Sequence, residues 1–164
     1  MKRFLLLMLA CVSAYAQDAI WNTIEPTRIF VAYREATLVA AAEVVTIQQP
    51  ATAPANVWFD GLSVYCSVAC SFTLERNGTA ATATEFTPAA ITPGLTAKAK
   101  AFGASDVGTG TVIARYVVPA GATVPVSVRG MKLRWNGGAG ENLTIRTSSI
   151  SGDVKILVRW GELI

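Results

Sequence analysis

The stretch DVKILVRW at residues 153–160 sets the pattern from which the fold follows. Its alternating apolar side chains are Val154, Ile156, Val158 and Trp160, and its charged side chains are Asp153, Lys155 and Arg159. Successive side chains of a β-strand point to opposite faces, so one set faces a core and the other faces water. The stretch therefore predicts an amphipathic strand with Trp160 in the core.

The same alternation recurs along the chain after residue 28, with turn signals between the runs. About ten strands are expected, at 28–34, 37–40, 43–48, 57–66, 70–76, 97–104, 111–118, 123–129, 131–135 with 141–147, and 153–160. Many short strands in one domain predict an all-β fold, an antiparallel two-sheet β-sandwich of jelly-roll-like form. Pro125 cannot donate to a strand ladder, so its strand should lie at a sheet edge.

Turn residues and one ambiguous segment complete this assignment. Ser151-Gly152-Asp153 is expected to form the last hairpin, and 87–96 a long connection between sheets. The alanine-rich segment 34–46 fits either a helix of three turns or strands. Strands are favoured because the segment contains β-branched residues and is followed by Pro50.

The composition limits the function classes. The chain has 164 residues, of which 52% are hydrophobic and 15% charged, and its formal net charge is +3. This excludes an acidic disordered chain, and the charge is too small for a protein dedicated to nucleic acid. The length predicts one domain.

The amino terminus resembles a secretory signal peptide. Two basic residues precede the apolar run 4–12, and Ala14-Tyr15-Ala16 has the small side chains that signal peptidase accepts. The run is shorter than the roughly 20 residues of a membrane span. We expect cleavage between Ala16 and Gln17, which leaves a net charge of +1 and places the protein in the periplasm or outside the cell. Lipidation at Cys11 is the alternative.

The expected organisation is therefore a signal peptide at 1–16 and a single β-sandwich domain at 17–164. Residues 17–27 are expected to be an extended N-terminal segment of that domain.

Two cysteines, Cys66 and Cys70, remain after cleavage. In an oxidising compartment such a pair predicts a disulfide. Residues four apart on one strand are separated by about 13 Å, whereas a disulfide needs Cα atoms within about 7 Å. The chain must turn between them, and we expect a hairpin. Zinc would need four ligands, and redox-active pairs have two residues between the cysteines, so both alternatives are weaker.

The sequence offers little chemistry for catalysis. The chain has no histidine, which excludes the common Ser-His and Cys-His arrangements, and its acidic residues are scattered singly. We expect no enzyme activity and no metal or cofactor. Exposed aromatics are the remaining candidates for a surface contact. Trp135 lies beside a glycine-rich segment. Trp58 directly precedes Phe59 on one strand, so the side chains of Trp58 and Phe59 must point in opposite directions.

Two segments carry a resemblance. Gly140–Arg146 followed by Gly152–Glu162, together with Phe72–Gly78, resembles the closing strands of small phage-type, TNF-like jelly-roll proteins. The resemblance implies a single jelly-roll domain, often trimeric, that serves as a building block or receptor-binding tip. Phage structural proteins assemble in the cytoplasm, so the signal peptide shifts the expectation to an exported bacterial protein of similar fold.

Two function hypotheses follow. The first is a secreted, non-enzymatic module with a structural, assembly or surface-interaction role that self-associates into a homo-oligomer, for example a trimer. The alternative is an extracellular carbohydrate-binding module that uses exposed aromatics. The partners expected are further copies of the chain, a glycan or an extracellular protein, with no nucleic acid and no membrane span.

Overall fold

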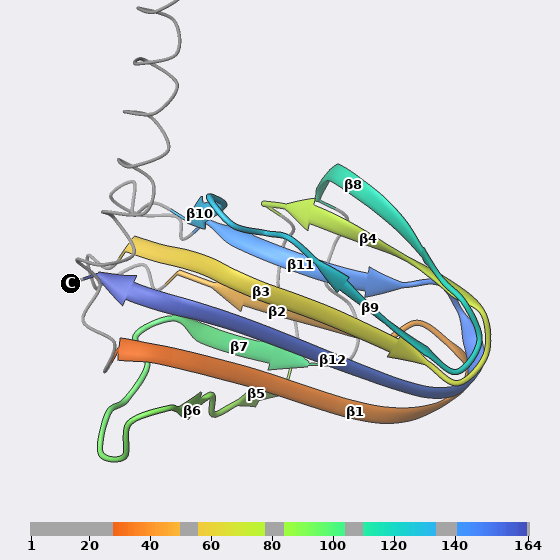
Figure 1. The fold of residues 1–164 in the computed structure, drawn as a ribbon, viewed down its shortest axis with the longest axis horizontal. Helices are drawn as coiled ribbons and strands as arrows, with labels where there is room; N and C mark the ends of the chain where they lie inside the picture. Colours follow the sequence, from red (N-terminus) through yellow and green to blue (C-terminus); the bar gives the residue numbers. More distant parts are fainter. Residues whose placement is uncertain (1–27, 50–55, 78–83, 104–109, 134–140, 164) are drawn as a thin grey trace, which may run out of the picture.

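The computed structural model describes residues 28–49, 56–77, 84–103, 110–133 and 141–163 (Figure 1). The signal peptide expected at 1–16 and the extended segment expected at 17–27 lie outside these ranges.

The described residues form two six-stranded antiparallel sheets packed face to face. Sheet A contains β1 (Ile29–Ala41), β3 (Asn56–Cys66), β6 (Ala89–Ala90), β9 (Ala122–Val126), β10 (Lys132–Leu133) and β12 (Ile150–Leu163). Sheet B contains β2 (Val44–Gln48), β4 (Cys70–Arg76), β5 (Thr84–Phe86), β7 (Lys100–Gly103), β8 (Thr111–Val118) and β11 (Asn142–Thr147). The predicted two-sheet β-sandwich is confirmed.

Each sheet mixes strands that are distant in the sequence. The order in sheet A is β10-β3-β12-β1-β6, with β9 also paired to β3, and the order in sheet B is β5-β7-β2-β11-β4-β8. The strand with Pro125, β9, pairs only with β3 among the described strands and lies at an edge, as predicted. Two of the twelve strands, β5 and β6, are short additions, and β6 lies inside the connection expected at 87–96.

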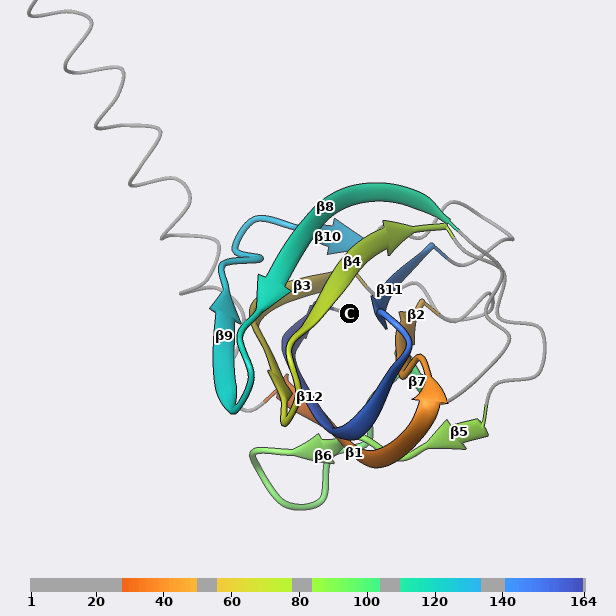
Figure 2. The same ribbon diagram turned by 90° about the vertical axis from the view of Figure 1, so that its right-hand side faces the viewer.

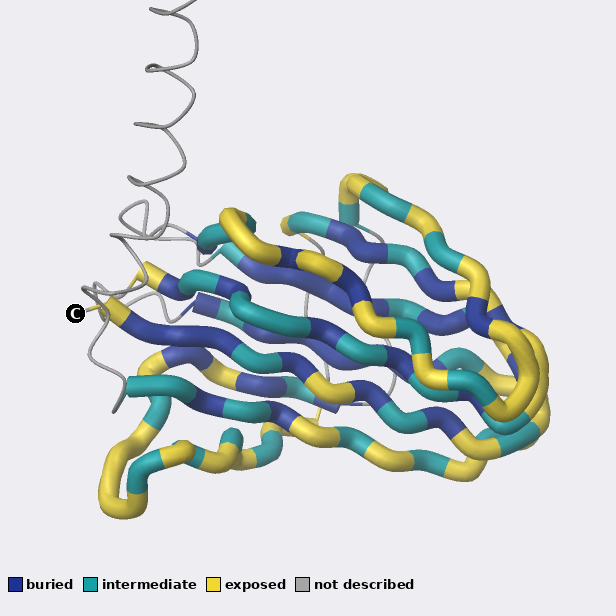
Figure 3. Tube along the Cα trace, in the orientation of Figure 1, coloured by how far each residue is buried: buried dark blue, intermediate teal, exposed yellow. Residues whose placement is uncertain are grey.

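The core lies between the sheets and follows the predicted alternation (Figure 3). All four apolar side chains singled out on β12 are fully buried, and the Trp160 ring packs 6.1 Å from the ring of Phe30. Phe59 and Phe72 bring the other large aromatic side chains into this core. Replacing such a ring by alanine removes about 3–5 kcal/mol of stability.

The alanine-rich segment 34–46 is extended, so the helix alternative is wrong. β1 continues to Ala41 and β2 begins at Val44. From Ile29 to Leu38 every residue of β1 pairs with β12, and these long-range pairs override the helix propensity of alanine.

One end of the sandwich carries four connections between the sheets, and we call it the crossing end. The connections β1–β2, β3–β4, β8–β9 and β11–β12 are two or three residues long, and each passes from one sheet to the other. In Figure 2 this end faces the viewer, and the strands curve around the core as they change sheet. Strands joined so closely are therefore neighbours along the chain but not within a sheet.

Two predicted hairpins are wrong for this reason. Cys66 ends β3 and Cys70 begins β4, as expected, but the two strands belong to different sheets. Ser151-Gly152-Asp153 lies inside β12, and the chain reverses before it, between Thr147 and Ile150. Turn residues indicate that the chain changes direction, but a hairpin and a sheet crossing need the same local turn chemistry.

Candidate functional site

The outer face of sheet A carries a shallow depression bordered by two tyrosines. Tyr33 on β1 lies opposite Leu157 on β12, which lies opposite Ser63 on β3. One step along the sheet, Lys155 on β12 lies opposite Tyr65 on β3. With Thr123 of β9, these side chains line a volume of about 460 Å³. We call this surface the tyrosine face, and it consists of Tyr33, Ser63, Tyr65, Thr123, Lys155 and Leu157.

Glu35 of β1, beside the tyrosine face, holds two of its polar groups in place. The hydroxyl of Tyr33, a side chain that is 50% exposed, donates a 2.7 Å hydrogen bond to Glu35. The ammonium of Lys155 lies 2.9 Å from the same carboxylate and 5.8 Å from the centre of the Tyr65 ring. A single carboxylate therefore positions one phenol and one ammonium on this face.

These contacts also keep the protonation states constant near neutral pH. The hydrogen bonds from Tyr33 and Lys155 lower the pKa of Glu35. The same bonds raise the pKa of Lys155 and, through the bond to Glu35, the pKa of Tyr33. Each shift favours the state that makes the bond, so the phenol stays neutral and the ion pair stays charged.

Other charged groups of this outer face also have partners. Arg159 of β12 lies 2.9 Å from the carboxylate of Asp60 in β3. Together with the Lys155–Glu35 pair, this gives two ion pairs across the middle of sheet A, and the nearby Asp153 carboxylate accepts a 2.6 Å hydrogen bond from Thr37. The aromatic rings therefore lie among charges that already have partners.

Trp58, predicted as a surface contact, lies at the other end of the same sheet. It is half-buried on β3, while the adjacent Phe59 is fully buried, so the expected opposite orientation of the two rings is confirmed. Lys132 of β10 lies opposite Trp58 in the register and holds its ammonium 4.9 Å from the indole ring. A ligand would have to displace this ammonium to use that side of the ring. Trp135 lies outside the described residues.

β8 forms one edge of sheet B and exposes apolar side chains. It pairs with β4, and no second strand of the described sheet lies beside it. Val112, Ile113 and Val117 are 41%, 42% and 74% exposed. The other edge strands described, β5, β6, β9 and β10, are two to five residues long, whereas β8 has eight residues. β6 covers only Phe30 and Val31, so most of β1 is a second long outer strand, and it carries Arg34 and Glu35. β8 is thus a long edge of the sandwich that exposes mainly apolar side chains.

A cleft of about 480 Å³ opens beside the β8 edge. Buried side chains of Phe59, Leu133 and Leu143 form part of its wall. Arg76 contributes a guanidinium that donates to the carboxylate of Glu141 at 2.7 Å and to the backbone carbonyl of Lys132 at 3.1 Å. This guanidinium therefore ties β4 to β10 and to the start of β11.

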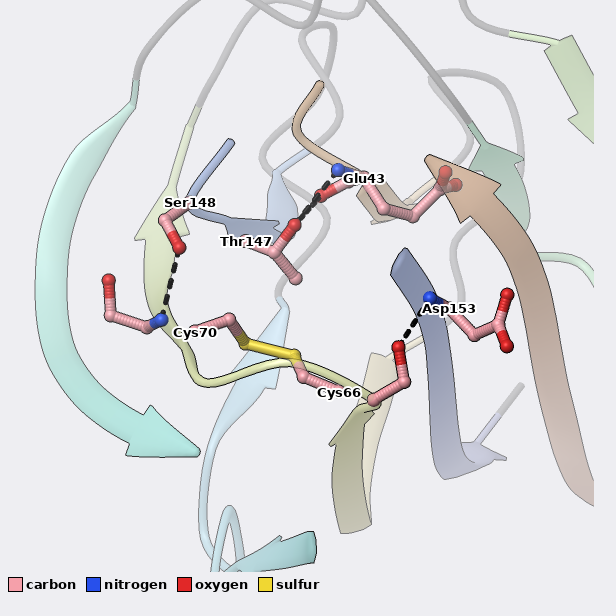
Figure 4. Close-up of a disulfide and its surroundings, with 8 residues drawn as sticks. Glu43, Cys66, Cys70, Thr147, Ser148 and Asp153 are labelled. Atoms are coloured by element: carbon pink, nitrogen blue, oxygen red, sulfur yellow. Dashed lines mark hydrogen bonds between the residues drawn. A yellow bond between two sulfur atoms is a disulfide. The ribbon is translucent and has the colours of Figure 1, made fainter. Parts of the chain in front are cut away.

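The cysteine pair acts as a structural link at the crossing end (Figure 4). A disulfide joins Cys66 and Cys70, whose Cα atoms are 6.3 Å apart, and both residues are buried. It spans the β3–β4 connection and so holds the two sheets together where the chain passes between them. A buried structural disulfide of this kind is less reactive than an exposed thiol in an electropositive environment.

Hydroxyl groups surround this disulfide and bind backbone amides. The Asp153 amide donates to the Ser67 hydroxyl at 2.7 Å, and the Ser71 amide to the Ser148 hydroxyl at 3.1 Å. The Glu43 amide donates to the Thr147 hydroxyl at 2.9 Å. These bonds link three of the four connections and satisfy amides that leave the sheet ladders.

Sequence reasoning missed part of this arrangement. Outward placement of Lys155 follows from the alternation on β12, and Tyr65 is one of the few aromatics in the chain. Tyr33 was not singled out, although Tyr33 and Glu35 are two residues apart on one strand, a spacing that places both on the same face. The tyrosine face draws on four strands, which local patterns cannot bring together.

Within the ranges that the structure describes, no group of three or more His, Cys, Asp or Glu side chains is arranged to hold a metal ion. The same ranges contain no helix with the length and apolar character needed to cross a membrane. Comparison with known proteins finds no matching family model, no matching curated protein and no matching solved structure.

Proposed function

We propose that this protein is a secreted, non-enzymatic jelly-roll module that self-associates and serves as a structural or assembly unit. A jelly roll has eight main strands in two sheets built from two Greek keys. The eight strands that border the four crossings are ordered β1-β12-β3-β9 and β2-β11-β4-β8. Counted from one to eight along the chain, these orders are 1-8-3-6 and 2-7-4-5, which supports a jelly roll.

Secretion is supported by the amino-terminal pattern and by the cysteine pair. The run of basic, apolar and small residues at 1–16 has the order of a signal peptide. A disulfide persists in the oxidising environment to which such a peptide leads.

The single observation that carries self-association is the exposed edge of β8. Unpaired backbone groups on an edge strand favour pairing with another chain, and proteins commonly prevent this with short edges, proline or charged side chains. The edge at β9 has Pro125, the edges at β5 and β10 are short, and the part of β1 that β6 leaves uncovered carries the charged residues Arg34 and Glu35. β8 has only Arg115 as a charged residue and exposes three β-branched apolar side chains. This edge is therefore suited to a second copy of the chain.

Oligomeric state and its dependence on β8 test the proposal. We expect the mature protein to elute as an oligomer in size-exclusion chromatography with light scattering, and Val117→Lys to shift it toward monomer. Val39→Lys is the matched control because Val39 is 86% exposed on β1, which belongs to the other sheet and does not pair with β8. A wild-type protein that stays monomeric at high concentration, or equal effects of both substitutions, would contradict the proposal.

The mass of the oligomer also identifies the type of interface. Pairing of β8 with β8 is self-complementary and gives a dimer, whereas pairing of β8 with a different surface gives a closed ring such as a trimer or an open filament. The resemblance to TNF-like proteins favours the ring.

A further inference from the structure

We propose that the tyrosine face binds a neutral saccharide, with the rings of Tyr33 and Tyr65 against the sugar and the intervening polar groups on its hydroxyls. This site lies on sheet A and is separate from the β8 edge of sheet B. Its aromatic rings belong to two tyrosines, whereas the sequence indicated Trp58 and Trp135 as candidate surface contacts.

The arrangement of side chains matches the two kinds of surface that a pyranose presents. A pyranose ring has apolar C–H faces and a rim of hydroxyl groups. The depression offers two aromatic rings and Leu157, which is 37% exposed, for the C–H faces. Ser63 and Thr123 add hydroxyls that can donate or accept, and Lys155 adds a donor. At about 460 Å³ the volume falls in the range of small-molecule sites, roughly 300–1,000 Å³.

Charge pairing makes a neutral ligand the best fit. The ammonium of Lys155 lies 2.9 Å from Glu35, and the guanidinium of Arg159 lies 2.9 Å from Asp60. An anionic sugar bound to Lys155 would share that ammonium with Glu35 and would meet the negative charge of the carboxylate. A neutral sugar hydroxyl can join the existing hydrogen bonds without breaking the ion pair.

The site is also organised before a ligand arrives. Tyr33 is held by its 2.7 Å bond to Glu35, and Lys155 by the same carboxylate. Side chains that are already ordered lose less conformational entropy on binding, which favours affinity.

A glycan array tests the ligand class. The mature protein is applied to neutral hexose and N-acetylhexosamine oligosaccharides printed beside their sulfated and sialylated forms. We expect binding to neutral members, with no gain from added negative charge. Binding to no glycan, or to acidic glycans alone, would overturn the inference.

Substitutions then locate the site by calorimetric titration of the strongest glycan. Tyr33→Ala and Tyr65→Ala should each weaken binding about tenfold or more, which is a loss of about 1.4 kcal/mol of binding free energy. Tyr33→Phe keeps the ring and should weaken binding less. Unfolding midpoints equal to wild type would show that the changes at exposed Tyr33 and half-buried Tyr65 leave the fold intact.

Val117→Lys separates this inference from the proposed self-association. It should leave the affinity for a single sugar site unchanged even if it dissociates the oligomer. Binding that is indifferent to both tyrosine substitutions, or lost on Val117→Lys alone, would overturn the tyrosine face as the site.

Discussion

The crossing end and the β8 edge differ in how their backbone groups are satisfied. At the crossing end a disulfide and the hydroxyls of Ser67, Thr147 and Ser148 hold the chain where it leaves one sheet for the other. Along β8, the backbone groups that point away from β4 have no partner strand in the described sheet. The comparison indicates that cross-links are concentrated where the sheets are joined, whereas the β8 edge leaves its outer backbone groups without a partner strand in the described sheet.

The largest expected effect comes from adding a methyl group at Gly152, where the neighbouring atoms leave no room for it. Its φ is +152°, and a Cβ there would lie 2.6 Å from the Ser67 hydroxyl, which holds the Asp153 amide. Gly152→Ala should therefore remove about 3 kcal/mol or more of unfolding free energy. The measurement is urea unfolding followed by tryptophan fluorescence. Gly61→Ala is the matched control because a Cβ at Gly61 meets no atom within 4 Å. Equal losses for the two variants would refute the role given to this close contact.

Removing the disulfide should have the next largest effect. The bond closes a very short loop, and the chain-entropy model gives about 2 kcal/mol for it. Cys66→Ala combined with Cys70→Ala should lower the urea midpoint accordingly, and reductant should change the wild type but not the double variant. A double variant as stable as the wild type would show that the hydroxyl contacts suffice to hold this end.

Acid should weaken the contacts of Glu75, a carboxylate on β4 that accepts a hydrogen bond from the Gly110 amide just before β8. Burial raises the pKa of Glu75, but hydrogen bonds from Arg146, Thr73 and the Gly110 amide outweigh it, so the net shift is downward. A carboxylate with a lowered pKa in the fold stabilises above its ordinary value of 4.5, and this contribution is lost as the pH falls through the lower value. Unfolding midpoints between pH 7 and pH 2.5 should fall less steeply for Glu75→Gln than for wild type. Parallel pH profiles would contradict this.

The smallest expected effect on stability is at the edge itself. Val117 is 74% exposed, so Val117→Lys should change the unfolding free energy of the monomer by less than about 0.5 kcal/mol. Dilute protein, at concentrations where no oligomer is present, gives the relevant measurement. A loss of more than about 1 kcal/mol would mean that this side chain belongs to the fold and not to an interface.

The strands could be predicted well because alternation is a local property. The expected strands at 70–76 and 111–118 match β4 and β8 residue for residue, and the burial of Trp160 is confirmed. Partners in the sheets could not be predicted. β12 pairs with β1, which lies more than a hundred residues earlier in the chain, and the local sequence of neither strand identifies the other as its partner.

The errors at the turns have a common physical cause. Gly152 was expected in a turn because glycine favours such positions, but in β12 it allows the close approach of Ser67. The actual reversal at Ser148 has no glycine or proline and is held instead by a hydroxyl contact with another strand. The tyrosine face was missed for a related reason, since its members come from β1, β3, β9 and β12.

The position of β12 between β1 and β3 has a consequence for how the chain acquires its structure. Sheet A lacks its central strand until residues 150–163 are available, so the earlier part of the polypeptide cannot settle into a stable intermediate that contains this sheet. Pairings this far apart in sequence also slow folding, because a long loop must close before any contact forms. Sheet A is therefore expected to close last, when β12 pairs with both β1 and β3.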